Sequence, residues 1–100
     1  MKHHVSAIIY DKKGRTISFG RNSYTKTHPL QAKAAKATGS PHRIYLHAEV
    51  AAIVRLKDNS RGYRIVVTRF DALGRPVCAK PCLSCQHVIK LAGIKYVEYT

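Results

Sequence analysis

The chain has 100 residues, of which 45% are hydrophobic and 23% are charged, a composition typical of one folded globular domain. No apolar stretch approaches the roughly 20 residues that a membrane-spanning helix requires, and the N-terminus lacks the cleavage site of a secretory signal peptide. Three cysteines, an odd number, favour metal binding in a reducing compartment over a disulfide framework. We therefore expect residues 1–100 to form a single domain of a cytoplasmic protein without membrane contact.

Positive charge is the unusual feature of the composition. Eighteen Lys and Arg residues against five Asp and Glu residues give a formal net charge of +13. Such a field attracts polyanions, including nucleic acids and phosphorylated metabolites. Because the basic residues are spread from Lys2 to Lys95, they fit a solubilising or phosphate-steering surface as well as a nucleic-acid groove.

The N-terminal part is predicted to form a β-hairpin followed by a helix. Residues 4–10 are rich in β-branched and aromatic side chains, and a second strand at 16–19 follows the turn sequence DKKGR. After a loop, Pro29 suits the first turn of a helix, which ends at the sequence Gly39-Ser40-Pro41.

A second helix is predicted over residues 46–57 and a strand over 63–70. The strand contains the run Ile65-Val66-Val67, which is apolar enough to be buried on both faces. The residues of the helix expected to face the core are Val50, Ala51, Ile53 and Val54.

The C-terminal part is predicted to form a helix over residues 82–92, ended by Gly93, and a last strand over 94–99. The order of elements, two strands, two helices, a strand, a helix and a strand, indicates an α/β sandwich. We expect its helices to pack on a mixed sheet of about four strands.

Two short motifs carry three candidate metal ligands. His47 of the sequence HAE lies at the start of one predicted helix, and Cys82 and Cys85 of PCLSC lie at the start of the next. One strand separates these helices, and because crossovers share a hand, both helices should lie on one face of the sheet with neighbouring N-termini. Three ligands leave tetrahedral zinc one open position, which is the arrangement of catalytic sites. The positive ends of both helix dipoles would favour thiolates there.

Glu49 follows His47 by two residues, about 200° further around a helix. It is therefore a poor fourth ligand, but at a helix end it can reach a bound water and transfer protons. Either motif alone is weak evidence, since CxxC also occurs in redox proteins. Together, separated by 35 positions, they favour one catalytic zinc per chain over a structural zinc, with Cys78 as a spectator thiol.

With these motifs the sequence resembles the zinc-dependent cytidine deaminase superfamily, whose signature is H-x-E followed by P-C-x-x-C. The stretches HAEVAAI and PCLSCQHVIKLAGIKYVEY most resemble the CMP/dCMP deaminase branch. The resemblance runs from about residue 4 to residue 99 and is most specific at the zinc motifs. It implies a three-layer α/β/α cytidine-deaminase-like sandwich, truncated after the fourth strand, because an N-terminal helix, a further helix and a fifth strand of relatives have no counterpart.

The resemblance also implies roles for individual residues. His47, Cys82 and Cys85 would bind zinc, and Glu49 would be the general acid and base. Proton transfer by Glu49 would then assist the attack of water on a cytosine ring.

Substrate contacts are implied less specifically. The backbone N–H of Ala48 would contact the pyrimidine carbonyl, and Asn22 would contact the sugar. His28 and Tyr45 are candidate contacts with the base or the sugar. Two of these residues also have plain structural interpretations: Asn22 suits a turn, and His28 before Pro29 suits a helix cap.

The expected function is hydrolytic deamination of a pyrimidine nucleotide, dCMP or CMP, with release of ammonia. Cationic side chains would hold the 5′-phosphate, with Arg21, Lys26 and Arg43 as candidates. The alternative substrate is cytosine, or less readily adenine, in single-stranded nucleic acid, which the net charge and the tyrosines Tyr24 and Tyr45 support.

A third hypothesis is a non-catalytic, zinc-containing nucleic-acid-binding module. The presence of Glu49 argues against it, since a structural site has no need of a general base. A homo-oligomer is also expected, because relatives assemble and because the predicted last strand, 94–99, leaves an open sheet edge.

Overall fold

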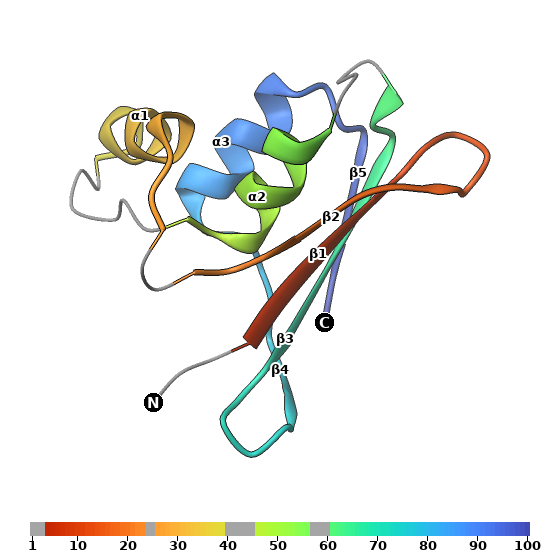
Figure 1. Ribbon diagram of the computed structural model, residues 1–100, viewed down its shortest axis with the longest axis vertical. Coiled ribbons are helices and arrows are strands. Elements are labelled where there is room, and N and C mark those ends of the chain that lie inside the picture. The colour runs from red at the N-terminus through yellow and green to blue at the C-terminus, as the bar shows by residue number, and fades with distance from the viewer. Residues whose placement is uncertain (1–3, 24–25, 40–45, 57–60) are drawn as a thin grey trace.

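The computed structural model describes residues 4–23, 26–39, 46–56 and 61–100. These residues form a mixed α/β fold (Figure 1). The strands are β1 (His4–Tyr10), β2 (Thr16–Arg21), β3 (Arg64–Phe70), β4 (Pro76–Val77) and β5 (Tyr96–Tyr99). The helices are α1 (Pro29–Ala37), α2 (Ala48–Arg55) and α3 (Leu83–Leu91).

The sheet has the strand order β2-β1-β3-β4, and β5 also pairs with β3. The β1–β2, β1–β3 and β3–β4 pairs are antiparallel, whereas β5 runs parallel to β3. Strands β4 and β5 pair with different parts of β3, the first at Arg69 and Phe70 and the second from Arg64 to Val67. The predicted strands are all present, and the two-residue β4 is an addition within a stretch predicted as loop.

All described helices lie on the same side of the sheet (Figure 1). Helix α2 packs on β1 and β2, α3 lies against α2, and α1 packs on α3. The predicted mixed α/β sandwich is confirmed, and α2 and α3 share a face as the crossover rule predicted. One difference from the three-layer arrangement is that the described helices do not cover the opposite face of the sheet.

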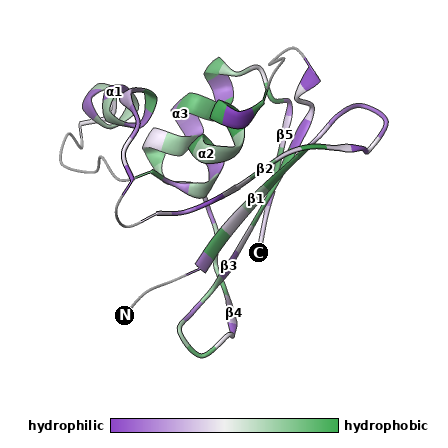
Figure 2. Cartoon of the chain, viewed as in Figure 1, coloured by the Kyte–Doolittle hydropathy of each residue, from purple (hydrophilic) through white to green (hydrophobic). Residues whose placement is uncertain are grey.

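The strands alternate between a buried face and an open face. Ala7, Ile9, Ile65 and Val67 point toward the helices and are fully buried, whereas Val66 is half-buried on the open face. The prediction that Val66 would be buried as deeply as its neighbours was therefore wrong, because no described helix covers that side. Figure 2 shows the corresponding concentration of hydrophobic residues in β1, α2 and α3.

The hairpins β1–β2 and β3–β4 turn on the same five-residue motif, DKKGR at residues 11–15 and DALGR at residues 71–75. In both, one oxygen of the aspartate accepts hydrogen bonds from two backbone N–H groups of the turn. Its other oxygen accepts from the arginine Nε at 2.8 Å in the first turn and 2.9 Å in the second. Gly14 and Gly74 have φ values of 79° and 77°, a conformation that glycine adopts without strain.

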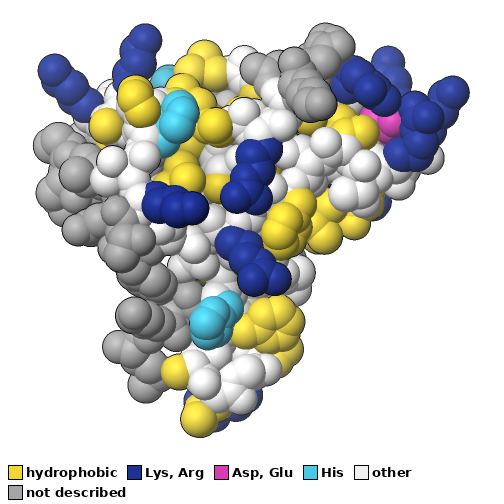
Figure 3. Space-filling view, viewed as in Figure 1, with side chains coloured by type: hydrophobic (Ala, Val, Ile, Leu, Met, Phe, Trp, Pro, Cys, Tyr) yellow, Lys and Arg dark blue, Asp and Glu magenta, His cyan; other side chains and the backbone are white. Residues whose placement is uncertain are grey.

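Basic side chains are widely distributed over the surface, with a dense group at the corner of the β1–β2 turn (Figure 3). This agrees with the spread of Lys and Arg along the sequence. None of the helices in the described part of the chain combines the length and hydropathy needed to cross a membrane.

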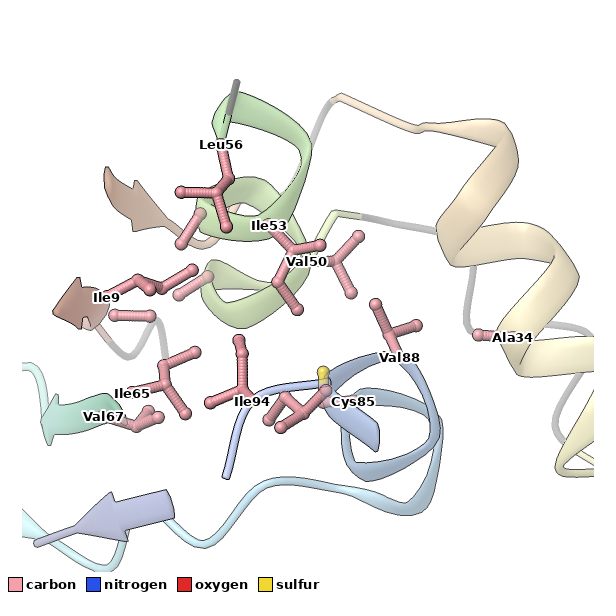
Figure 4. Packing of buried hydrophobic residues seen from close by; sticks show 14 of the residues in the cluster. Ile9, Ala34, Val50, Ile53, Leu56, Ile65, Val67, Cys85, Val88 and Ile94 are labelled. Atoms are coloured by element: carbon pink, nitrogen blue, oxygen red, sulfur yellow. The ribbon is translucent and has the colours of Figure 1, made fainter. Parts of the chain in front are cut away.

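The core lies between the sheet and the helices α2 and α3 (Figure 4). Ile9 and Ile65 from the sheet meet Val50 and Val88 from the helices, and each is at most 2% exposed. Of the α2 residues predicted to face the core, Val54 is 41% exposed. The prediction for Val54 was wrong: α2 is buried from Ala48 to Ile53, whereas its last two residues, Val54 and Arg55, are exposed at the C-terminal end of the helix.

Candidate functional site

The N-terminal ends of α2 and α3 carry the three predicted metal ligands. His47 is the N-cap of α2 and Cys82 is the N-cap of α3, both with extended backbone, while Cys85 lies in the first turn of α3. His47 Nδ1 lies 3.1 Å from Cys85 Sγ and 3.4 Å from Cys82 Sγ. The three ligand atoms lie within 4.8 Å of one another. The structure thus brings together residues that are 35 positions apart in sequence.

The chemistry of this group suits zinc. Zn–S bonds of about 2.3 Å and Zn–N bonds of about 2.0 Å put tetrahedral ligand atoms roughly 3.5 Å apart, close to the separations seen here. A hydrogen bond from Cys85 lowers the pKa of Cys82 to about 3, and the same hydrogen bond together with burial raises the pKa of Cys85. The two sulfurs therefore hold one proton between them, and a divalent cation bound by both would displace it.

Glu49 lies beside this group in the first turn of α2. It is 5% exposed and lies close enough to His47 and Cys85 for both to influence its carboxyl group. Burial is the main effect on its carboxyl group and raises the pKa. The predicted 200° offset from His47 does not apply, because His47 is an extended cap outside the helix. Glu49, in the first turn of α2, can therefore lie close to His47 and to the two cysteines.

Helix α1 connects to the starts of both metal-bearing helices. Gln31 Oε1 accepts a hydrogen bond from the His47 backbone N–H at 3.2 Å, and Thr38 Oγ1 lies 2.8 Å from Ser84 Oγ. Gln31 is fully buried, and its Nε2 has no hydrogen-bond partner among the described residues. Gln31 and Thr38 were not predicted to belong to the site. Their helical spacing with the buried Ala34 and Ala35 was the available signal.

Strand β2 holds α2 on its other side by a close backbone approach. A Cβ atom added to Gly20 would collide with backbone atoms of Ala48, Ala51 and Ala52. The Ser18 hydroxyl donates a hydrogen bond to the carbonyl of Ala52. The absence of a side chain at Gly20 therefore determines how near the start of α2 lies to the sheet.

Comparison with known families adds to this geometry. A family model described as the cytidine and deoxycytidylate deaminase zinc-binding region matches residues 1–100. The chain belongs to this family. Its cofactor is therefore zinc, and His47, Cys82 and Cys85 form the candidate group for binding it in this deaminase domain. No curated protein matches the chain significantly.

The residues predicted to contact the substrate of the deaminase domain differ from one another in burial and in hydrogen bonding. Ala48 is fully buried as the first residue of α2. Asn22 follows β2, and its side-chain oxygen accepts a hydrogen bond from the Val5 backbone N–H at 3.1 Å. His28 caps α1, because its Nδ1 accepts from the Leu30 N–H at 3.0 Å, so its structural interpretation is confirmed. Tyr45 lies outside the described residues.

The segment before α2 in this deaminase domain is joined to the end of β2. Leu46 donates a backbone hydrogen bond to Lys26 at 2.9 Å, and its carbonyl accepts one from Ser23 at 2.8 Å. Residues from the β2–α1 connection therefore lie next to His47. Two further candidates for substrate contact, Tyr24 and Arg43, lie outside the described residues.

Proposed function

We propose that this deaminase domain hydrolyses a cytosine nucleotide, dCMP or CMP, to the uracil form and ammonia. The observation that carries the proposal is the carboxyl group of Glu49, which is 5% exposed and lies beside His47, Cys82 and Cys85. Burying a carboxylate costs free energy, and a purely structural metal site does not require one. A general acid and base next to an activated water does require it.

The proposed roles follow from the positions of the side chains. His47, Cys82 and Cys85 would hold zinc, which when bound would lower the pKa of a water molecule toward 7 and so supply a nucleophile for C4 of the cytosine ring. Glu49 accepts a proton from this water and delivers it to N3. A second proton from the same water reaches the departing amino group through Glu49, so that water and cytosine yield uracil and ammonia.

In this proposal, residues at the N-terminus of α2 and at the end of β2 orient the substrate. The Ala48 N–H belongs to the first turn of α2, where backbone donors lack helical partners, and would donate to the pyrimidine carbonyl. Asn22 would contact the sugar. Arg21 at the end of β2 and Lys26 within the β2–α1 connection are exposed and could neutralise a 5′-phosphate, with Arg43 as a further candidate.

The mechanism is tested by Glu49→Gln. The variant should keep its zinc but lose turnover by a factor of about 10² to 10⁴ or more, because the amide cannot accept the proton. Glu98→Gln, which changes an exposed carboxylate on β5, should keep both zinc and activity. Near-normal turnover of zinc-loaded Glu49→Gln would exclude this mechanism.

The substrate is tested with dCMP, CMP, deoxycytidine and a single-stranded oligonucleotide containing cytosine, with ammonia release and base conversion as readouts. We expect turnover of the free nucleotides and a loss of efficiency when the 5′-phosphate is absent. The net charge of +13 favours the oligonucleotide as the second candidate. Conversion of the oligonucleotide alone would replace the nucleotide proposal.

A further inference from the structure

A cationic hollow of about 510 Å³ lies at one end of the sheet. It is formed by the β1–β2 turn, the segment entering β3 and the connection between α3 and β5. We call it the basic hollow. Its cationic lining residues are Lys12, Lys13, Arg15, Arg61 and Lys95.

Of the described residues that line the basic hollow, one carries a carboxylate, and it already forms ion pairs. Asp11 Oδ2 lies 2.8 Å from Arg15 Nε and 3.6 Å from Arg61 Nη2. Among the described lining residues, five cations and one carboxylate leave four net positive charges. Figure 3 shows this concentration of Lys and Arg at the corner where Figure 1 shows the β1–β2 turn.

The basic hollow is distinct from the metal centre. The metal ligands lie at the N-terminal ends of α2 and α3, whereas Gly93 and Lys95 of the hollow follow the C-terminal end of α3. The nine residues of α3 span roughly 13 Å along the helix axis. A molecule bound in the hollow therefore approaches the opposite end of these helices from the deaminase site.

An exposed aromatic side chain adjoins the cations. Tyr63 lines the hollow, and its ring centroid lies 5.1 Å from that of Tyr96, with the rings edge to face. Tyr96 is 46% exposed, and Lys95 Nζ lies 5.6 Å from its ring centroid. The positively charged surface thus continues onto an accessible aromatic ring.

This combination points to one class of ligand. The arginine side chains of the hollow are largely exposed, 61% for Arg15 and 53% for Arg61, so they do not enclose a small anion. A polyanion gains affinity at such a surface from the release of counterions at each contact. Stacking of bases on aromatic rings adds an uncharged contribution that single strands can make.

We propose that the basic hollow and Tyr96 bind single-stranded nucleic acid, with phosphates on the Lys and Arg side chains and a base on Tyr96. The site goes beyond the deaminase function proposed above, because the bound strand needs no cytosine. Its test is a binding measurement and does not depend on turnover.

The β3–β4 turn indicates which residues can replace the lysines of the β1–β2 turn without changing the turn conformation. It has the same hydrogen-bonded scaffold as the β1–β2 turn, with Ala72 and Leu73 where the latter has Lys12 and Lys13. The double substitution Lys12→Ala/Lys13→Leu therefore creates the sequence DALGR, which already forms this turn in the same chain. The contacts of Asp11 with Arg15 are retained.

The first experiment measures binding of a labelled oligothymidylate of about 30 nucleotides by fluorescence anisotropy over a range of salt concentrations. Lys12→Ala/Lys13→Leu should weaken binding about tenfold at low salt and reduce the slope of log K against log salt by about 1.4, for two lost phosphate contacts. The control, Lys33→Ala/Lys36→Ala, removes two exposed lysines of α1 and should leave the slope near the wild-type value. An equal loss of oligothymidylate affinity in the two double variants would overturn the proposal.

The second experiment separates stacking from charge. Tyr96→Leu should weaken oligothymidylate binding about tenfold without changing the salt slope, and Tyr96→Phe should bind normally. Binding of heparin, a polyanion without bases, should be insensitive to Tyr96→Leu. An unchanged oligothymidylate affinity, or an equal loss for heparin, would identify a general polyanion surface and contradict the proposal. Thermal unfolding checks each variant, and Lys12→Ala/Lys13→Leu should keep the wild-type activity on dCMP.

Discussion

The three cysteines of the chain occupy different environments. Cys85 is buried, Cys82 is half-buried and Cys78 is exposed. Cys82 and Cys85 lie against His47, whereas Cys78 is not part of the candidate metal group. Substitution of each cysteine can therefore separate the two candidate metal ligands from Cys78.

We predict one zinc per chain by elemental analysis of the purified protein. Cys82→Ala and Cys85→Ala should each lose the metal, because two remaining ligands do not hold zinc in a tetrahedral site. Cys78→Ala should retain it. Chelation should also lower the unfolding temperature, since a core this small depends on its metal. Two zinc ions per chain, or full occupancy in Cys82→Ala, would contradict the assignment.

Residue patterns in the sequence predicted the candidate metal ligands and the proton-transfer residue, but not the residues that hold them in position. His47, Glu49, Cys82 and Cys85 could be found because each lies at a predicted helix start and belongs to a residue type with metal or proton chemistry. Gln31 could not be found in this way, since a glutamine in an alanine-rich helix usually faces solvent. The spacing of Gln31 with Ala34 and Ala35 indicates a shared face of α1, but the contact of that face with His47 depends on tertiary packing.

At the scale of elements, the contact between β2 and α2 determines where the deaminase site lies on the sheet. Two glycines of the first hairpin allow a matched test. Gly20 is in backbone contact with α2, whereas a Cβ at Gly14 would meet nothing within 4 Å. Any side chain at Gly20 must push α2 and its N-cap His47 away from β2.

We predict that Gly20→Ala destabilises the protein by about 3 kcal/mol and weakens zinc binding, because overpacking displaces the backbone of α2. Gly14→Ala should cost about 1 kcal/mol, since it only strains a left-handed turn residue, and should leave zinc binding unchanged. Chemical denaturation and zinc competition with a chelator measure both effects. Equal stability of the two variants would show that α2 adjusts freely.

Element boundaries illustrate what local patterns can resolve. The second helix was predicted over 46–57, but α2 begins at Ala48 and ends at Arg55. Leu46 lies before the helix because its backbone pairs with Lys26 and Ser23, contacts from another part of the chain. Strand β4 was not predicted, because two residues are too few for a periodic pattern.

At the scale of the whole molecule, the open face of the sheet carries exposed apolar side chains. Phe19 is 38% exposed, and the half-buried Ile8 and Val66 follow it across the sheet. Phe70, which is 39% exposed, lies further along β3. Burying such a face stabilises association. The net charge of +13 opposes it, and salt screens this repulsion.

We predict a homo-oligomer at micromolar concentration, detectable by light scattering and favoured by moderate salt. Phe19→Lys should shift the equilibrium toward the monomer, because it places a charge on the apolar face. Leu73→Lys, at an exposed position of the β3–β4 turn, is the control and should not change the assembly. A strictly monomeric wild-type protein would refute this expectation.

The sequence by itself determined the strands and helices long enough to show a period, and it predicted the candidate metal ligands and Glu49, which the structure places together. Those inferences needed only residues close in sequence and the known chemistry of His, Cys and Glu side chains. The tertiary structure alone decided that the described helices cover one face of the sheet, that Gln31 supports His47, and that residues near positions 12, 61 and 95 surround one basic hollow. These features depend on distances between segments that are remote in sequence, and packing of the core sets those distances.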